Sequence, residues 1–255
     1  MPSARVSKAA ERSANRFSPA VYDGMYGQFA AYNADLARVC VAAAGISEVD
    51  HLVELGCGTG LFSQPLIEGF RPRHFTGIDS NAGMVAQAAA RLKSRNVTLR
   101  CDDAQNLSTY FRPGTIDVIA IKAAYHHFDD RLPLDDLLGF LTDRGRLIVV
   151  ERTPRSAATF PVYAEARAHW EACLARRAEA TLHDHRSLLE RGCYGRTVRM
   201  ASKGYFEALE HGQLSFTWRF EPELVRTWAR LAGSVSGEFV EVYEEFDVSV
   251  FGKVP

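Results

Sequence analysis

The sequence predicts an α/β protein with a doubly wound, mostly parallel sheet of seven strands whose last strand is antiparallel. Three observations indicate this fold class. Short β-branched apolar runs alternate with longer segments of helical spacing between residues 51 and 151. A glycine-rich stretch directly follows the first run, where such sheets turn from a strand into a helix. Residues 238–251 alternate apolar and polar side chains with no long crossover, which is typical of antiparallel pairing.

The individual elements follow from the same patterns. Five runs have the length and β-branched content of buried parallel strands, namely His51–Leu55, His74–Asp79, Val97–Cys101, Asp117–Lys122 and Arg146–Glu151. Helices are expected over 81–94, with Asn81 as the N-cap, and over 131–142. A later helix begins at Glu221–Pro222 and ends at Gly233. We expect residues 238–251 to form two strands.

Composition and charge exclude several classes of function. The 255 residues carry a net charge of -1, which argues against bulk electrostatic binding to nucleic acid or anionic membranes. No apolar run reaches the roughly 20 residues that cross a bilayer, and the first residues lack the apolar core of a secretory signal. The five cysteines show no C-x-x-C spacing, as expected of reduced thiols. We therefore expect a cytoplasmic protein, as a monomer or a homodimer, with no nucleic-acid or membrane partner.

The most informative motif is the loop after the first strand. Gly56, Gly58 and Gly60 allow backbone N–H groups to approach a ligand closely. Asp79 ends the next strand, where a carboxylate can accept hydrogen bonds from both hydroxyls of a ribose. Leu61 stands where the dinucleotide fingerprint G-x-G-x-x-G requires glycine, which disfavours a nicotinamide cofactor.

The motif order resembles that of the class I S-adenosylmethionine-dependent methyltransferases. Glu54-Leu-Gly-Cys-Gly-Thr-Gly60 resembles their first motif. Residues 77–79 with Met84 resemble the ribose-binding segment, and residues 101–107 the adenine-contacting segment. Residues 116–122, followed by Tyr-His-His-Phe128, resemble the fourth motif, and residues 141–148 the turn into strand five.

This resemblance implies S-adenosylmethionine as the cofactor and assigns contacts to its methionine end. Glu54 would support the glycine loop and reach the methionine amino group. Gly56, Gly58 and the backbone at Cys57 would face the methionine and ribose portions. The carbonyl of Lys122 would contact the amino group as well.

The resemblance also assigns the nucleoside end. Asp79 would hold the ribose hydroxyls, with Ser80 and Met84 beside the adenine. Asp103 would accept a hydrogen bond from the adenine amino group, and the Ala104 N–H would lie near a ring nitrogen.

Candidate residues for the acceptor follow strand four. An imidazole at the carboxyl end of a strand suits proton removal, so His126 is a candidate general base and His127 a second candidate. The alternative is that a ring packs under the cofactor or binds a backbone group. Tyr22 would shield the sulfonium through a cation–π contact, or else pack on the core. No metal site is expected, because the adjacent His183-Asp184-His185 would point to different faces of a helix.

Four regions are expected on this basis. Residues 1–16 form a disordered tail, and residues 17–46 form an N-terminal helical lid. Residues 47–151 and 214–255 form the methyltransferase core. Residues 152–213 form a helical substrate cap, whose arginines either bind a carboxylate or phosphate or face solvent.

The expected function is methyl transfer from S-adenosylmethionine to a small molecule, with S-adenosylhomocysteine as the product. The acceptor atom, oxygen, nitrogen or carbon, stays open, and a specialised metabolite is expected. One alternative is an NAD(P)-dependent Rossmann oxidoreductase. The other is a member of the family that binds the cofactor without transferring a methyl group.

Overall fold

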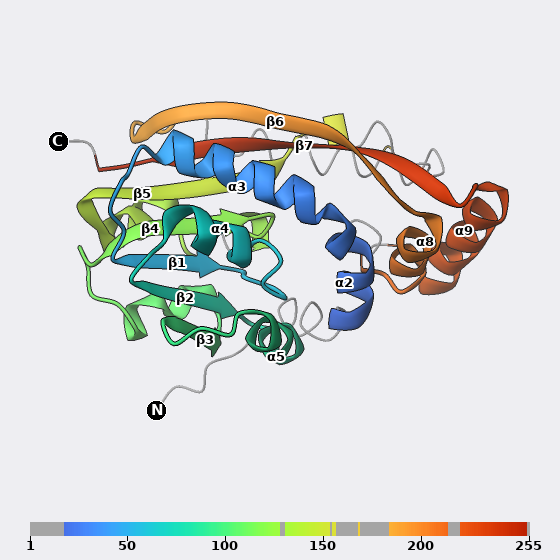
Figure 1. The fold of residues 1–255 in the computed structure, drawn as a ribbon, viewed down its shortest axis with the longest axis horizontal. Helices are drawn as coiled ribbons and strands as arrows, with labels where there is room; N and C mark the ends of the chain where they lie inside the picture. Colours follow the sequence, from blue (N-terminus) through green and yellow to red (C-terminus); the bar gives the residue numbers. More distant parts are fainter. Residues whose placement is uncertain are drawn as a thin grey trace.

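The computed structural model describes residues 18–127, 131–153, 155–156, 168, 184–213 and 220–253. Its strands form a seven-stranded sheet in the order β3-β2-β1-β4-β5-β7-β6 (Figure 1). Their bounds are β1 His51–Leu55, β2 His74–Asp79, β3 Val97–Cys101, β4 Ile116–Lys122, β5 Leu141–Arg152, β6 Leu188–Ala201 and β7 Phe239–Phe251. Strands β1 to β5 are parallel, and β7 runs antiparallel to both β5 and β6. The predicted fold class is confirmed.

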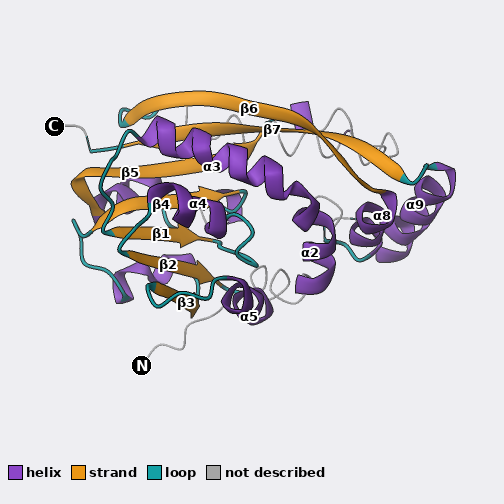
Figure 2. Cartoon of the chain, in the orientation of Figure 1, coloured by secondary structure: helices purple, strands orange, loops and turns teal. Residues whose placement is uncertain are grey.

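Helices pack on both faces of this sheet (Figure 2). Their bounds are α2 Pro19–Tyr26, α3 Ala30–Ala44, α4 Ser63–Phe70, α5 Ala82–Arg91, α6 Leu134–Phe140, α8 Ser202–Glu210 and α9 Pro222–Val235, with short 3-10 turns η1 Gly27–Phe29, η2 Ala104–Thr109 and η3 Tyr125–His127. Side chains alternate between two apolar layers. In β4, Val118 joins the layer that holds α3 and α4, and Ile119 joins the layer that holds α6. No helix of the described part is long and apolar enough to cross a membrane.

The first half of the chain follows the expected pattern closely. The strands predicted at 51–55, 74–79 and 97–101 have the predicted bounds. The side-chain oxygen of Asn81 accepts hydrogen bonds from the N–H groups of Gly83 and Met84, at 2.9 and 3.1 Å, so the predicted N-cap of α5 is confirmed. Helices α5 and α6 are shorter than predicted. α5 stops where Leu92 leaves the helical backbone conformation, and α6 begins only after Pro133.

The C-terminal stretch is one strand, so the prediction of two strands over 238–251 is wrong. β7 runs from Phe239 to Phe251 without a turn. It pairs with β5 along residues 246–251 and with β6 along residues 239–251. The apolar and polar alternation therefore belongs to a single long strand whose first half depends on β6 for its neighbour.

That neighbour lies inside the segment predicted to be a helical cap. Residues 188–201 form β6, so the helical prediction is wrong there and the sheet extends beyond the predicted core. Most β6 side chains are exposed, because β6 is an edge strand, and such a strand lacks the apolar periodicity that reveals a buried one. Residues 202–210 are helical, as α8. The tail 1–16 and most of 152–183 lie outside the described residues.

Candidate functional site

The glycine loop joins β1 to α4 at the carboxyl edge of the sheet. The φ angles are +73°, +53° and +79° at Gly56, Gly58 and Gly60, a region that favours glycine. A Cβ on Gly56 would lie 2.5 Å from the Cβ of Ala124, so the loop passes close to the end of β4. A Cβ on Gly58 would meet no atom within 4 Å. The loop is thus tight on one side and open at Gly58.

Asp79 connects this loop to the end of β2. Its Oδ2 accepts a hydrogen bond from the Gly58 N–H at 2.8 Å, and its Oδ1 accepts one from the Asn81 N–H at 2.9 Å. Burial raises the pKa of Asp79 above its usual value. Ser80 beside it is exposed, whereas Met84 is buried on α5. The carboxylate therefore lies next to the open side of the loop.

Cys57 anchors the glycine loop to β2. Its N–H and that of Gly56 both donate to the carbonyl of Ile78, at 3.1 and 2.8 Å. The thiol is buried, and burial raises its pKa. Because a Cβ on Gly77 would come within 3.0 Å of the Cys57 sulfur, the side chain packs against β2. These contacts give Cys57 a structural role, in which it holds the glycine loop against β2.

Glu54 and Lys122 lie at the ends of the neighbouring strands β1 and β4. Glu54 is buried, accepts a hydrogen bond from the Ser63 hydroxyl on α4, and has its pKa raised to about 8 by burial. Burial lowers the pKa of Lys122 to about 8, and its Nζ lies 4.8 Å from the centroid of the Phe246 ring. The sequence motif predicts a role only for the Lys122 carbonyl, and the partly buried ammonium is an additional feature of this edge.

Asp103 and Ala104 follow β3 at the same edge. Asp103 caps η2 by accepting a hydrogen bond from the Gln105 N–H at 3.1 Å, and Ala104 is buried as the first residue of that turn. The other oxygen of Asp103 lies 2.9 Å from Nη1 of Arg131. No sequence motif marks Arg131 as a site residue. Any further donor would have to share this carboxylate with the guanidinium.

Helix α2 lies across the carboxyl ends of β1 and β2, whose arrowheads point toward it (Figure 1). Its Tyr22 is half-buried, and burial, with the neighbouring Asp79 among its further causes, raises the Tyr22 pKa. The Asp23 carboxylate accepts hydrogen bonds from Thr59 Oγ1 at 2.5 Å, Gln87 Nε2 at 3.0 Å and Arg91 Nη2 at 2.7 Å. One residue of α2 thus binds the glycine loop and α5, a contact that the sequence analysis missed.

His126 lies in η3, just after β4, and faces the end of β5. Its Nδ1 is 3.2 Å from each carboxylate oxygen of Glu151. The two side chains are only 14% and 13% exposed, and His126 Nε2 is buried with no hydrogen-bond partner in the described part of the chain. The His127 ring lies 4.0 Å from that of His126 but is exposed. Parallel pairing of β4 and β5 brings Glu151 to His126, and no local motif marks it.

Residues 52–145 match the family model described as "Methyltransferase domain". The matched segment is similar to a methyltransferase domain, and the sheet has the strand order of the class I S-adenosylmethionine-dependent methyltransferases. The resemblance of the motifs is confirmed. The matched range holds the glycine loop, the acids at the ends of β1 to β3, and both candidate histidines.

Three known proteins illustrate the similarity of this methyltransferase domain. Malonyl-[acyl-carrier protein] O-methyltransferase of Bacillus anthracis is 35% identical over 79 residues, 31% of this chain and 28% of the relative. Trans-aconitate 2-methyltransferase of Rhizobium rhizogenes is 24% identical over 115 residues, 45% of this chain and 43% of the relative. The structure of Haemonchus contortus phosphoethanolamine N-methyltransferase 2 with S-adenosyl-L-methionine superposes with a TM-score of 0.56, at 15% identity, covering 99% of this chain and 62% of that one. The chain spans less than half the length of these two curated relatives.

Two cap arginines, predicted either to bind an anionic substrate or to face solvent, have carboxylate partners on β7. Nε of Arg152 lies 2.8 Å from Glu244, in a pair that is almost fully buried, and Arg155 lies 3.5 Å from Glu245. The other arginines considered for this role, Arg167, Arg176 and Arg177, lie outside the described residues, as does His183. His185 lies 3.4 Å from Asp135.

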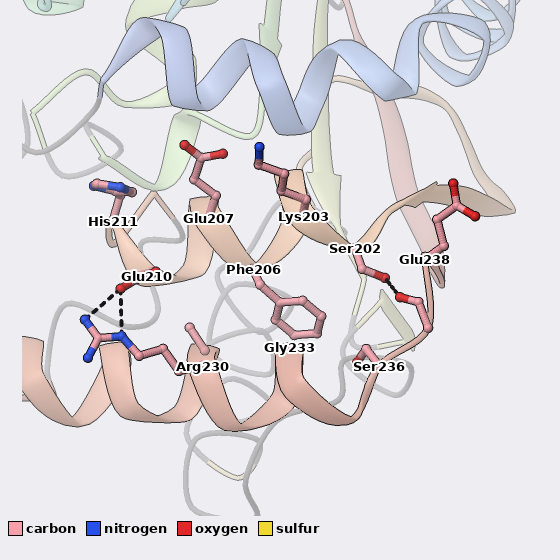
Figure 3. Close-up of a pocket in the computed structure, with 12 residues that line it drawn as sticks. Ser202, Lys203, Phe206, Glu207, Glu210, His211, Arg230, Gly233, Ser236 and Glu238 are labelled. Atoms are coloured by element: carbon pink, nitrogen blue, oxygen red, sulfur yellow. Dashed lines mark hydrogen bonds and ion pairs between the residues drawn. The ribbon is translucent and has the colours of Figure 1, made fainter.

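A separate hollow lies between α8 and α9, away from the glycine loop of the methyltransferase domain (Figures 1 and 3). Phe206 and Gly233 line its middle, and Glu210 forms an ion pair with Arg230 at 3.0 Å. The Ser202 hydroxyl donates to the carbonyl of Gly237. None of the residues predicted for the cofactor or the acceptor lines this hollow.

Proposed function

We propose that this protein transfers a methyl group from S-adenosylmethionine to a small-molecule acceptor and releases S-adenosylhomocysteine. The observation that carries the proposal is the pairing of the Asp79 carboxylate with an open glycine loop. Asp79 accepts a hydrogen bond from the Gly58 N–H, and the space beside Gly58 is free of other atoms within 4 Å of an added Cβ. A ribose with two vicinal hydroxyls fits a carboxylate in this position.

The donor and acceptor set suits the whole of S-adenosylmethionine. Its ammonium and sulfonium are cationic, and the site offers carboxylates instead of a phosphate cradle. Glu54 is buried and accepts a hydrogen bond from Ser63 at the start of α4, from where it would support the loop. The backbone from Gly56 through Cys57 to Gly58 would face the methionine and ribose portions. The carbonyl of Lys122 would contact the methionine amino group.

The nucleoside end would extend toward η2. Ser80 is exposed at the edge of β2, and Met84 offers an apolar wall from α5. Asp103 would share its carboxylate between Arg131 and the adenine amino group, and the N–H of Ala104 would face a ring nitrogen. A carboxylate has enough lone pairs for both partners.

The bound cofactor would supply an electrophilic methyl group, and the residues of this chain would orient the acceptor and exclude water. Tyr22 on α2 would cover the sulfonium, so only α2 within the predicted lid of residues 17–46 would act as a lid. Helix α3 instead packs in the core on the sheet. His126 is the proposed general base and would lie beside the acceptor. His127 is more exposed and is the second candidate.

A metabolite acceptor is supported by the relatives, which are named for malonyl-[acyl-carrier protein] and for trans-aconitate. We propose no nucleic-acid partner, because the net charge is -1. Cys40, Cys57, Cys101 and Cys193 are unpaired, which supports a reducing, cytoplasmic location. The proposed oligomeric state, a monomer or a homodimer, is measurable by light scattering.

Calorimetry with S-adenosylhomocysteine and with NADH tests the cofactor. We expect binding of the first and none of the second, and the reverse would support the oxidoreductase alternative. Incubation with S-adenosylmethionine carrying a labelled methyl group and a metabolite extract, read by mass spectrometry, tests transfer. Binding without any labelled product would favour a member of the family that does not transfer methyl.

A further inference from the structure

We infer that Glu151 positions His126 with its proton on Nδ1 and its lone pair on Nε2, and that the site is therefore built for an acceptor that must lose a proton. Such acceptors include a hydroxyl or an acidic C–H group. A carboxylate that is already ionised is outside this class. The chemical part of the inference rests on the proposed function, whereas the state of the ring does not.

The distances determine which nitrogen carries the proton. Nδ1 of His126 lies 3.2 Å from both oxygens of Glu151. An ionised carboxylate only accepts hydrogen bonds, so the nitrogen that faces it must be the donor. In the neutral ring, Nε2 is then the acceptor. Because both side chains are about one-seventh exposed, water competes weakly for this contact.

Among the described residues, no hydrogen-bond partner explains the burial of the second nitrogen, Nε2. His126 Nε2 is buried and forms no hydrogen bond to any described residue. Buried polar atoms are usually paired, so an unpaired one in a candidate site indicates a bound group that the free chain lacks. η3 lies at the same edge of the sheet as the glycine loop, because Ala124, just before η3, nearly touches Gly56.

These positions allow a proton to pass from the acceptor to His126 during methyl transfer. The acceptor X–H bond breaks and its proton moves to His126 Nε2, while the lone pair of X forms the bond to the methyl carbon. The C–S bonding pair stays on the sulfur of the neutral thioether product. The Glu151 carboxylate stabilises the imidazolium, which returns its proton to solvent after the product leaves. An ionised carboxylate has no proton to give at neutral pH, so the pair would not accelerate its methylation.

Nitrogen-15 NMR of the histidine rings tests the position of the proton without any acceptor. The His126 signals are identified by their loss in His126→Gln. We expect the neutral ring of the wild type to carry its proton on Nδ1. In Glu151→Gln the amide can donate as well as accept, so the Nε2-protonated form should appear. Glu151→Asp keeps the carboxylate and should restore the wild-type form.

Glu241→Gln, on the exposed side of β7, is the matched control and should leave the His126 signals unchanged. Melting curves show which variants fold. The inference is overturned if the wild-type ring carries its proton on Nε2, or if Glu151→Gln leaves the tautomer unchanged.

The choice of acceptor is tested with acceptors found by the metabolite screen. Glu151→Gln should lower kcat by about a hundredfold for a hydroxyl or carbon acceptor, with an unchanged Kd for S-adenosylhomocysteine. Equal kcat values for wild type and variant would overturn the inference while leaving the proposed function intact. A wild type that fails to bind S-adenosylhomocysteine would instead overturn the proposed function, and the NMR result would still stand.

Discussion

Asp23 is the residue whose replacement best tests how the N-terminal helix is held over the site. Its carboxylate contacts Thr59 in the glycine loop and both Gln87 and Arg91 on α5. Asp23→Ala removes all three contacts, which join α2 to the glycine loop and to α5. We expect this variant to be less stable and to bind S-adenosylhomocysteine more weakly.

The size of the effect follows from the burial of the contacts. The Asp23 and Arg91 side chains are 16% and 21% exposed, so the pair is screened only in part. A hydrogen bond to a charged group contributes roughly 1.5–3 kcal/mol. Water can replace some partners of Arg91 and Gln87, whereas Thr59 is buried. We therefore expect a loss of about 3 kcal/mol, or a fall of about 9 °C in Tm for a chain of this size.

Thermal melts and calorimetry measure the two effects. Asp23→Asn keeps an acceptor for Thr59 but loses the charge that faces Arg91, and should lie between wild type and alanine. Asp50→Ala is the control, because the Asp50–Arg73 pair is 65% and 80% exposed and surface pairs contribute little. We expect the Kd of Asp23→Ala to rise about tenfold, or 1.4 kcal/mol. Equal Tm values for Asp23→Ala and Asp50→Ala would refute the reasoning, and an unchanged Kd would show that α2 does not act as a lid.

Three further predictions concern the loop and the acids around it. Asp79→Ala should weaken S-adenosylhomocysteine binding, measured by calorimetry, by at least about tenfold, since a hydrogen bond to a charged group is lost. An unchanged Kd would show that Asp79 does not bind the ribose. Gly56→Ala should destabilise the fold by about 3 kcal/mol, because a strained backbone conformation adds to the overlap of the new Cβ with Ala124. Gly58→Ala has the backbone strain without the overlap and should destabilise the fold less. Equal denaturation midpoints for the two variants would contradict this. The pKa of Glu54 is about 8 in the fold against an ordinary 4.5, so the folded chain binds this proton more tightly and the unfolding free energy should fall as pH rises from about 5 to 8. Glu54→Gln should lessen that fall, by up to about 5 kcal/mol, and identical pH profiles for variant and wild type would show that Glu54 is not buried as a neutral acid.

The candidate site divides into residues that local sequence identifies and residues that it does not. Gly56, Gly58 and Asp79 lie in short motifs, since a loop needing positive φ selects glycine and the end of the next strand must bring its side chain beside that loop. Asp23 and Glu151 lie in no motif. Each acquires its role from a contact with a residue at least 25 positions away.

The fold divides in the same way. Buried parallel strands have a strong local signal, because both of their faces must be apolar, and the bounds of β1 and β2 were predicted from it. β3 is a largely exposed edge strand, and its bounds were predicted from its length and β-branched residues. β6 has no such signal, because its side chains are largely exposed and its hydrogen bonds depend on β7. The sequence by itself determined the fold class, the bounds of β1, β2 and β3, the glycine loop and the family of the domain. Only the tertiary structure decided that β6 extends the sheet, that Asp23 anchors the N-terminal helix, and that Glu151 orients His126, because these depend on backbone pairing and charge contacts between segments far apart in the chain.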